Sequence, residues 1–554
     1  MFIERGNIVS KNDSNENTGM RLLKKWQRGL INVVFSRVGI MSLLLIGQFV
    51  ILLLGFVWFN DFLPHVYGGS TIFGLVMVIY LINSDHNPTA KITWLAIIVF
   101  LPIFGIALYA FTESDLGHRK VRDRLKEMVK ETGDLLPPSE DVIEDISRRE
   151  TGAASLCKYL YNRGKFPTYN NMGVKYFKSG EAKFEELLIQ LEKAESFIFL
   201  EYFIIDEGLM WGKVLDILAQ KAKEGVDVRV MYDGTCEFSS LSHDYPKRLK
   251  KLGIKCEVFA PITPFVSTHY NYRDHRKILV IDGHTAFTGG INLADEYINK
   301  VEKYGHWKDT AIMVKGPAVK SFTLMFLQTW SNMGKKEPAI EKYLQWNEAK
   351  LLEGSRKETS MEDDVRREEV KEQGYIVPYG DCPLDGDKIG ERVYMDILNR
   401  SQKYVHIMSP YLILDSEMET AIKFAAERGV DVKIILPGIP DKKIPYALAK
   451  THYRTLIGSG VKLYEYTPGF VHAKVFVSDD IEGVVGTINL DYRSLYHHFE
   501  CGAYMYDTEC IPHMEEDFQE TLSKCRKVTE ETIKREKLIV RMVGYLMKGF
   551  APLM

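Results

Sequence analysis

The sequence has few cysteines and no strong excess of either charge, and both absences exclude classes of function. Its seven cysteines are scattered over 554 residues without a Cys-x-x-Cys pair or a Cys/His cluster, so neither a zinc site nor a disulfide framework is predicted. Free thiols suit a reducing cytosol. The formal net charge of −3 lacks the basic excess typical of nucleic-acid-binding proteins, so no nucleic acid is expected as a partner.

The chain has instead considerable length and long apolar runs near its amino terminus. With 46% hydrophobic residues among 554, it can form two to four domains with substantial cores. Val38–Phe59 and Ile92–Phe111 carry no charge, and each is long enough to cross the roughly 30 Å hydrocarbon layer as one helix. A third apolar segment, Phe62–Asn83, contains a proline and two glycines near its start, and it is interpreted as a full span or as a re-entrant segment.

Basic residues flank these segments and bear on their orientation. Residues 1–20 are polar, and Arg21–Arg28 mixes basic residues with Leu and Trp, as in an interfacial helix on anionic lipid or the positive flank of a span. A second basic stretch is Arg119–Arg124. Because cytoplasmic flanks are usually basic, the pattern favours a multi-pass protein of the cell membrane with a cytoplasmic catalytic part. The sequence does not decide between two and three membrane crossings.

The rest of the chain is an internal repeat. Ala222–Gly234 recurs as Ala426–Gly438, and strand-like segments flank both copies in the same order. Each copy is typical of a helix that ends at glycine and is followed by a strand. Strands that alternate with helices predict an α/β fold with two homologous halves of mixed, largely parallel sheets around one shared site, preceded by an α-helical transmembrane region.

These features divide the chain into six predicted parts. A polar tail with a basic interfacial segment is followed by a transmembrane region, a basic connector, a first half, a charged linker and a second half. Their bounds are 1–37, 38–111, 112–165, 166–346, 347–373 and 374–554. The linker has mixed charge and almost no apolar periodicity, so no chemistry is assigned to it.

Each half carries the same set of polar residues. A His-x-Lys-x4-Asp motif followed by a Gly-x-Ile-Asn segment occurs twice with identical spacing. Its members are His275, Lys277, Asp282 and Asn292 in the first half, and His472, Lys474, Asp479 and Asn489 in the second. Histidine and lysine two residues apart face the same side of a strand, whereas the aspartate faces away or lies beyond the strand's end. Two such copies inside matching repeats predict a function.

These residue types suit metal-independent chemistry on a phosphodiester. Such chemistry needs a nucleophile, an acid for the leaving oxygen, and cations for the developing charge. Two histidines supply the first two roles, and the lysines supply the charge without a metal or another cofactor. The asparagines follow the next strand and are placed to donate to a phosphate oxygen. The motifs therefore predict one bipartite site.

The paired motifs resemble those of the phospholipase D superfamily, and most of the chain is similar to the bacterial cardiolipin synthases. The closer likeness lies in Gly117–Lys120 after the apolar segments, Leu200–Ile204, Asn271–Lys277, Trp307–Thr310, Gly316–Val319 and Asn489–Ser494. This resemblance implies a two-step transfer through a phosphatidyl-histidine intermediate. One phosphatidylglycerol donates the phosphatidyl group, glycerol leaves, and a second phosphatidylglycerol accepts it. Anionic membrane lipid is therefore the expected partner, and oligomeric state is not indicated.

The resemblance also implies roles for single residues. His275 is taken as the nucleophile and His472 as the acid and base, although the near-symmetry of the motifs permits the reverse. Asp282 and Asp479 would orient the two histidines. Glu296 and Glu500 would support them from behind.

Rival functions remain open from the sequence. A hydrolase would use the same residues with water as acceptor on phospholipid or nucleic acid, and it differs only in how water is excluded. The apolar spans and the charge balance disfavour a nuclease. A non-catalytic scaffold is disfavoured by intact motifs in both copies. Phosphatidylethanolamine as one substrate is not excluded.

Two local features complete the sequence evidence. His497 and His498 are adjacent, and neighbours on a strand face opposite sides, so a shared ligand role is not expected. The tail Val540–Phe550 is apolar with two basic residues. It predicts either a membrane-docking segment or a last packed helix.

Overall fold

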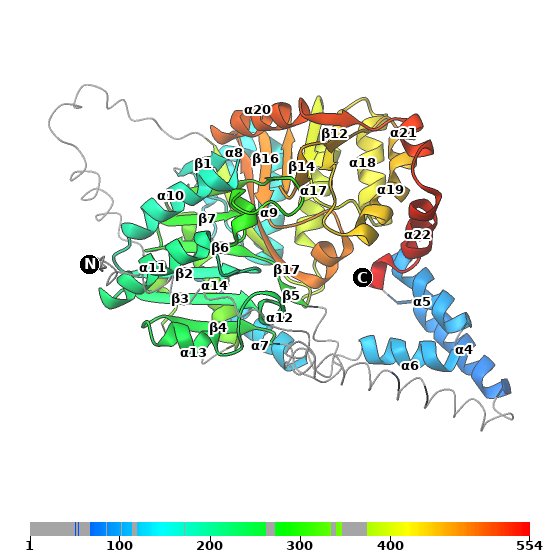
Figure 1. The fold of residues 1–554 in the computed structure, drawn as a ribbon, viewed down its shortest axis with the longest axis horizontal. Coiled ribbons are helices and arrows are strands. Elements are labelled where there is room, and N and C mark those ends of the chain that lie inside the picture. The colour runs from blue at the N-terminus through cyan, green and yellow to red at the C-terminus, as the bar shows by residue number, and fades with distance from the viewer. Residues whose placement is uncertain are drawn as a thin grey trace, which may run out of the picture.

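Two mixed sheets, one from each half, lie side by side in the computed structural model (Figure 1). Three short helices lie at one corner, α4 Tyr67–Ile82, α5 Pro88–Phe100 and α6 Pro102–Glu113. The structure describes residues 67–84, 86–100, 102–113, 119–170, 172–261, 272–333, 339–345 and 374–553, together with Val50 and Leu54. The predicted segments Arg21–Arg28 and 347–373 lie outside these residues, and so does Val38–Phe59 apart from Val50 and Leu54.

The first sheet has seven strands in the order β1-β9-β7-β6-β2-β3-β4. The strands are β1 Gly173–Phe177, β2 Phe197–Tyr202, β3 Asp227–Asp233, β4 Lys255–Phe259, β6 Lys277–Ile281, β7 Thr285–Gly289 and β9 Ala311–Lys315. The helices of this half are α10 Gly180–Glu192, α11 Leu209–Lys223, α12 Cys236–Ser239, α13 Tyr245–Lys250, α14 Val319–Met333 and α15 Glu341–Leu344, with a short turn of helix η4 Asp295–Ile298. Apolar residues of α10 and α11 share one core with the sheet, whereas α14 belongs to a core that also contains strands of the second half.

The second sheet repeats this order as β10-β17-β16-β15-β11-β12-β13 and adds β18 at its edge. The strands are β10 Tyr375–Asp381, β11 Tyr404–Met408, β12 Asp431–Pro437, β13 Lys462–Tyr466, β15 Val475–Ser478, β16 Glu482–Gly486, β17 His498–Tyr506 and β18 Cys525–Lys527. The helices are α17 Ile389–Arg400, α18 Ser416–Glu427, α19 Lys443–Gly458, η5 Arg493–His497, α20 Cys510–Leu522, α21 Glu530–Lys534, α22 Leu538–Lys548 and η6 Ala551–Leu553. The two halves are thus homologous in topology, as the repeat predicts.

Short strands connect the halves. β5 Arg273–Asp274 of the first half pairs with β17 of the second. In return, β14 Gly469–Val471 of the second half pairs with β8 His306–Lys308 of the first. Because each short strand comes directly before a motif histidine, this exchange brings the two motifs together.

The prediction of largely parallel sheets is wrong. In the first sheet, only the pairs β2–β3 and β3–β4 are parallel, and all other neighbours are antiparallel. The second sheet follows the same pattern. The turn between β6 and β7 has only Asp282, Gly283 and His284, and so short a connection forces antiparallel pairing.

The apolar amino-terminal region also differs from its prediction. Ile92–Phe111 is not one continuous helix, because α5 Pro88–Phe100 ends before α6 Pro102–Glu113 begins. Pro102 lacks the amide that a continuing helix needs, and its ring clashes with the preceding turn. The uncertain segment Phe62–Asn83 contains α4 Tyr67–Ile82. None of the described helices combines the length and the apolarity that a bilayer crossing needs.

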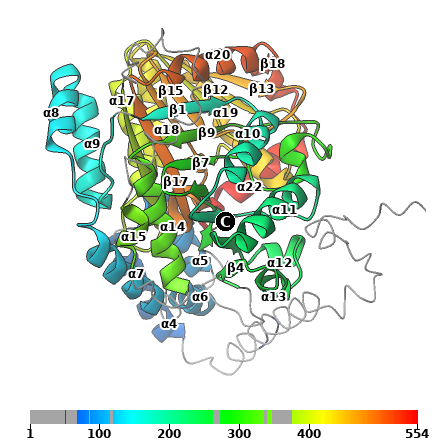
Figure 2. The same cartoon turned by 90° about the vertical axis from the view of Figure 1, so that its left-hand side faces the viewer.

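The basic connector is part of the folded body. It forms α7 Arg119–Thr132, α8 Glu140–Arg149 and α9 Thr151–Gly164. Residues of α8 and α9 join the core of the second half, and α7 packs on α14. Figure 2 shows α8 and α9 along one side of the molecule.

Candidate active site

Each of the two motif histidines is hydrogen-bonded to a carboxylate from the other half. His275 Nδ1 lies 2.9 Å from both carboxylate oxygens of Glu500, and His472 Nδ1 lies 2.7 Å from Asp309 Oδ2. All four side chains are buried. Each histidine is therefore held by a group that only the partner half can supply.

The strand exchange explains these pairs. The amide of His275 donates to the carbonyl of Phe499 at 2.9 Å, and the amide of His472 donates to that of Lys308 at 2.7 Å. Phe499 and Lys308 each precede one of the two carboxylates by a single residue. Backbone pairing therefore fixes the position of each imidazole relative to its carboxylate.

Asp309 and Glu500 occupy equivalent positions, and the sequence prediction misses Asp309. Asp309 stands two residues before Ala311, which pairs with Gly289 of β7, and Glu500 stands in the same relation to the partner of Gly486. The segment between the motif asparagine and the carboxylate is longer in the first half. The equivalence of Asp309 and Glu500 is therefore visible in the register of the sheets and not in the spacing of the residues along the chain.

Glu296, the residue proposed from sequence as the counterpart of Glu500, lies elsewhere. Its carboxylate accepts from Lys303 Nζ at 2.6 Å, and no contact with either motif histidine is present among the described residues. Its assignment as a supporting residue is therefore wrong, and Asp309 takes that place.

Asp282 and Asp479 do not reach the histidines either. Each lies in a tight turn with a positive φ of 52° or 54°, and each accepts three backbone amides at 2.6–2.8 Å. The donors are Glu195, Ser196 and Phe197 for the first aspartate, and Gln402, Lys403 and Tyr404 for the second. The aspartates thus fix the starts of β2 and β11, and the orienting role predicted for them is not what the structure shows.

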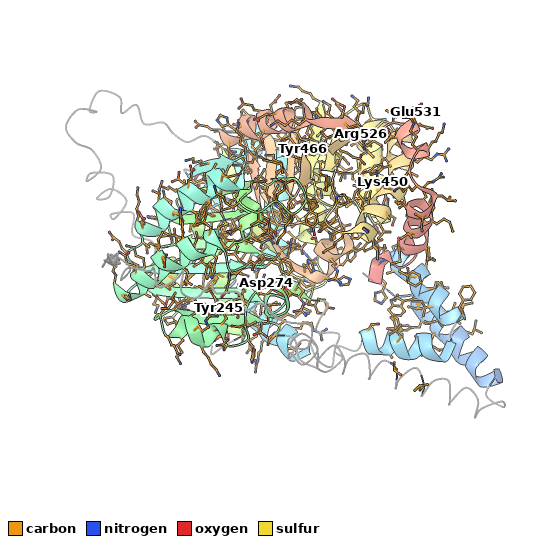
Figure 3. All side chains as sticks on the ribbon, in the orientation of Figure 1. Tyr245, Asp274, Lys450, Tyr466, Arg526 and Glu531 are labelled. Carbon is orange, nitrogen blue, oxygen red and sulfur yellow. The ribbon has the colours of Figure 1, made fainter. Side chains whose placement is uncertain are left out.

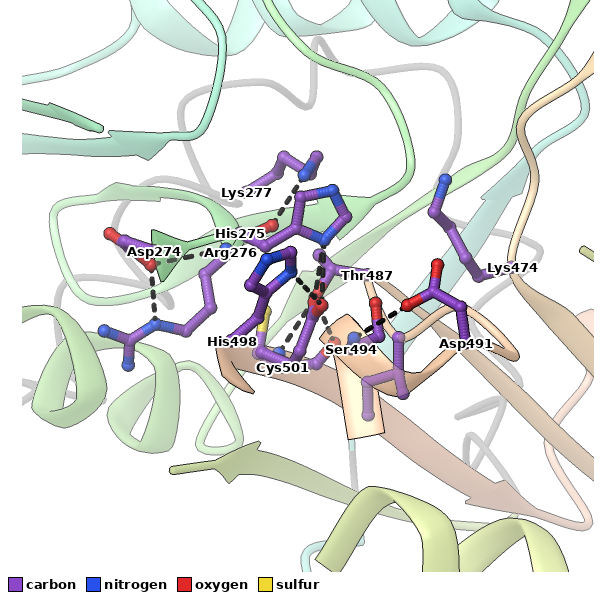
Figure 4. A network of polar contacts seen from close by, with 12 residues as sticks. Asp274, His275, Arg276, Lys277, Lys474, Thr487, Asp491, Ser494, His498 and Cys501 are labelled. Carbon is purple, nitrogen blue, oxygen red and sulfur yellow. Dashed lines mark hydrogen bonds and ion pairs between the residues drawn. The ribbon is translucent and has the colours of Figure 1, made fainter. Parts of the chain in front are cut away.

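The motif lysines lie close to the histidines of their own half. Lys277 Nζ donates to the carbonyl of His275 at 2.5 Å, and Lys474 donates in the same way to the carbonyl of His472. Burial lowers the pKa of Lys277 to about 8 and that of Lys474 to about 7. Figure 4 shows Lys277 directly above His275 and Lys474 to its right. A bound phosphate would restore their full charge, because an anion favours the protonated form.

Burial also keeps the histidines neutral. It lowers the pKa of His472 to about 4, with Lys474 adding to this effect and Asp309 opposing it. Burial places the pKa of His275 well below its usual range, although Glu500 opposes the shift. Since a carboxylate only accepts, each Nδ1 carries the hydrogen and each Nε2 keeps a lone pair. Both imidazoles are thus prepared to attack or to accept a proton at Nε2.

Several rings pack on each motif histidine, and the two halves differ at one equivalent position. His498 stands two residues before Glu500, with its ring centroid 5.4 Å from that of His275. Trp307 stands two residues before Asp309, with its ring 5.5 Å from that of His472. The near-symmetric site therefore has an ionisable ring on one side and an indole on the other.

One set of these residues has the composition of a metal site. The ligand atoms of His275, His498 and Glu500 lie within 4.8 Å of one another, the one such group in the described part of the chain. Two histidines and a carboxylate suit Zn²⁺. Glu500, however, already accepts from His275 and from the hydroxyl of Thr487. Metal-independent chemistry stays a prediction.

The two motif asparagines differ in their surroundings. Asn292 Oδ1 accepts from the amide of Ile204 at 3.0 Å, and its Nδ2 donates to the hydroxyl of Tyr297 at 2.7 Å. Asn489 Oδ1 is buried without a hydrogen-bond partner among the described residues. Phosphate binding by these amides stays a prediction, and Asn489 is the less engaged of the two.

Comparison with known families supports the assignment by resemblance. A family model described as "Cardiolipin synthase, PLD-like domain" matches residues 187–330 and 394–522. A second, described as "Phospholipase D-nuclease N-terminal", matches residues 71–112. The first model covers both histidine motifs and both carboxylates.

Several bacterial proteins are similar over most of their length. A protein from Streptococcus mutans called "Uncharacterized protein" is 54% identical and covers 86% of this chain and 99% of its own. Cardiolipin synthases from Halalkalibacterium halodurans and Geobacillus kaustophilus are 31% and 30% identical. They cover 87% and 94% of this chain, and 92% and 99% of their own.

A solved structure shares the fold. The phosphatidylserine synthase of Haemophilus influenzae Rd KW20 superposes with a TM-score of 0.53 at 18% identity. The alignment covers 72% of this chain and 98% of that one. At this identity the likeness concerns the fold alone.

Proposed function

The chain belongs to the bacterial cardiolipin synthase family, a group of phospholipase D-type phosphatidyltransferases, and from that premise we propose that it makes cardiolipin and glycerol from two molecules of phosphatidylglycerol. The observation that carries this proposal is the reciprocal pairing of His275 with Glu500 and of His472 with Asp309. One site thereby holds a nucleophile and an acid in equivalent settings, as a two-step transfer requires.

In the first step, His275 Nε2 attacks the phosphorus of one phosphatidylglycerol. The bond from phosphorus to the glycerol oxygen breaks, and that oxygen takes a proton from His472 Nε2. The bound anionic phosphodiester favours protonation of His472 despite its low pKa in the free enzyme. Glu500 stabilises the positive ring of the phosphatidyl-histidine through Nδ1–H.

In the second step, a hydroxyl of another phosphatidylglycerol replaces glycerol. His472, now neutral, takes the hydroxyl proton while the oxygen attacks phosphorus. The bond from phosphorus to His275 breaks, cardiolipin leaves, and both histidines return to their initial states. Lys277, Lys474 and Asn489 supply charge and hydrogen bonds to the phosphate oxygens in both steps.

The substrates place the enzyme at a membrane. Membership of the family and the amino-terminal match at residues 71–112 support membrane association. We assign a multi-pass topology in the bacterial cell membrane with a cytoplasmic catalytic part, because both basic flanks, Arg21–Arg37 and Arg119–Arg124, favour that side. Accessibility of a cysteine introduced at Ile189 to an impermeant reagent, in intact cells against lysed cells, tests the side.

Product analysis tests the reaction itself. The purified full chain, incubated with phosphatidylglycerol vesicles, is expected to release cardiolipin and glycerol in equal amounts by mass spectrometry. His275→Ala and His472→Ala are each expected to remove detectable turnover. Phosphatidic acid as the sole product would show that the enzyme is a hydrolase and not a synthase. Full activity in either variant would refute the shared site.

A further inference from the structure

The last long helix of the chain exposes an apolar face that no described residue covers. Its side chains recur at helical spacing and are more than 60% exposed: Leu538, Ile539, Met542, Tyr545 and Leu546. The opposite face packs on α19. There Gly544 permits close contact, since a Cβ at this position would lie 2.4 Å from the carbonyl oxygen of Ala447. The helix is therefore anchored on one side and open on the other.

Basic residues surround this apolar face. Lys534, Arg535, Lys537, Arg541 and Lys548 lie on or just before α22. Arg541 and Arg454 line a groove between α19, α21 and α22, which Glu530 and Glu536 also line. Neither arginine makes an ion pair with any described residue, whereas Glu536 pairs with Lys450. Figure 3 marks Lys450 on α19 and Glu531 on α21, the two helices that border this groove with α22. Lys534, in contrast, pairs with Glu530 at 3.8 Å. An apolar face beside the two unpaired arginines fits the boundary between acyl chains and anionic head groups.

We propose that α22 is an interfacial helix that docks on the anionic phospholipid bilayer from which the substrates come. A second copy of the chain is a poorer occupant, because an isologous contact would bring the same unpaired cations together. The sequence left two alternatives for this tail, docking on a membrane or packing as a last helix. The structure confirms the packing on one face, and the proposed docking uses the other.

The apolar region at the amino terminus continues this surface. Thr93 Oγ1 of α5 donates to the carbonyl of Gly549, directly after α22, at 2.7 Å. The outer sides of α4 and α5 are apolar and more than half exposed at Leu75, Val76, Ile79, Ile92 and Phe100. Figure 1 shows α22 next to α5. Segments from the two ends of the chain thus meet the bilayer together and set the tilt of the catalytic body.

This docking is linked to the candidate active site, and in that respect it rests on the proposed function. Ala551 packs in one apolar cluster with Tyr492, and the backbone of Pro552 lies beside His497. These contacts hold η5, which leads directly into His498 and Glu500. Docking of α22 therefore positions the segment that carries Glu500, the hydrogen-bond partner of His275, at the membrane surface.

Fluorescence quenching tests the docking. A bimane-labelled cysteine replaces Leu546 in the full chain, in a background where Cys256, Cys382 and Cys525, which are partly accessible, are serine. Nanodiscs contain phosphatidylglycerol and spin-labelled lipid. Quenching by the lipid label is expected at this site and not at the matched control Ile189→Cys, an exposed apolar residue of α10. Quenching by aqueous iodide alone, or cross-linking to a second copy, would overturn the proposal.

Activity separates this inference from the proposed function. Met542→Asp together with Leu546→Asp is expected to lower the rate on phosphatidylglycerol vesicles at least about tenfold. The rate on the same lipid dispersed in nonionic detergent is expected to stay near wild type, and Ile189→Asp serves as the matched control. Equal rates on vesicles would overturn the docking. Lipid quenching without any cardiolipin would leave the docking intact and refute the synthase.

Discussion

His275 of the first half is held by Glu500 of the second, with Nδ1 2.9 Å from both carboxylate oxygens. The reciprocal pair is arranged in the same way, with His472 Nδ1 2.7 Å from Asp309 Oδ2. The arrangement follows from β5 and β14, which each add a short strand to the other half just before the histidine. Neither half contains a complete histidine and carboxylate pair, so separation of the halves would disable both.

The first prediction concerns the carboxylates. Glu500→Gln keeps the size of the side chain but removes the negative charge that stabilises an imidazolium on His275. We expect kcat to fall about 10²–10⁴-fold, the usual contribution of such acid–base support. Asp309→Asn is expected to act similarly. Glu296→Gln is the matched control, because its carboxylate contacts Lys303 and neither motif histidine. An equal loss of kcat there would contradict the assignment of the supporting role to Glu500 and Asp309.

The second prediction concerns the motif aspartates, which bind backbone amides and not histidines. Asp282→Ala leaves three amides at the start of β2 without an acceptor. We expect a loss of about 1–3 kcal/mol in stability, seen as a lower midpoint of thermal unfolding. The kcat per folded molecule should change by less than about threefold, since no acid–base group is removed. A fall in kcat as large as that of Glu500→Gln would instead support the orienting role that the sequence predicts for Asp282.

The third prediction follows from the low pKa of His472. The first step needs one histidine protonated and the other neutral. With a pKa of about 4 in the free enzyme, the protonated fraction of His472 rises about tenfold for each unit that the pH falls between 7 and 5. We therefore expect kcat/KM to rise on acidification over this window. A maximum near the usual pKa of histidine would show that burial does not depress it.

The fourth prediction concerns metals. Dialysis against a chelator is expected to leave the rate unchanged, because no proposed step uses a metal. Added Zn²⁺ is expected to inhibit, since His275, His498 and Glu500 offer three ligand atoms within 4.8 Å. His498→Phe should weaken this inhibition without affecting the chelator result. Loss of activity in the chelator, restored by one metal, would contradict metal-independent chemistry.

Much of the fold was accessible from sequence because its signals are local. The repeat, the buried strand after each Lys277 or Lys474, and the turns that follow depend on residues close in the chain. Strand direction differs from the prediction, because strands alternate with helices only from β2 to β4 and in their counterparts β11 to β13. The apolar composition of Ile92–Phe111 predicts one continuous helix, but Pro102 ends the first helix and starts a second.

The sequence by itself determined that two His-x-Lys motifs with equal spacing sit in homologous halves, because strand periodicity and repetition are properties of neighbouring residues. Only the tertiary structure decided which carboxylate meets which histidine. Glu500 is 225 residues from His275, and Asp309 is 163 from His472. Over such distances chain connectivity imposes no geometry, and contact is set by strand exchange and sheet register. Strand alternation predicts only that Asp282 and Asp479 face away from the histidines. The tertiary structure shows that both bind backbone amides instead.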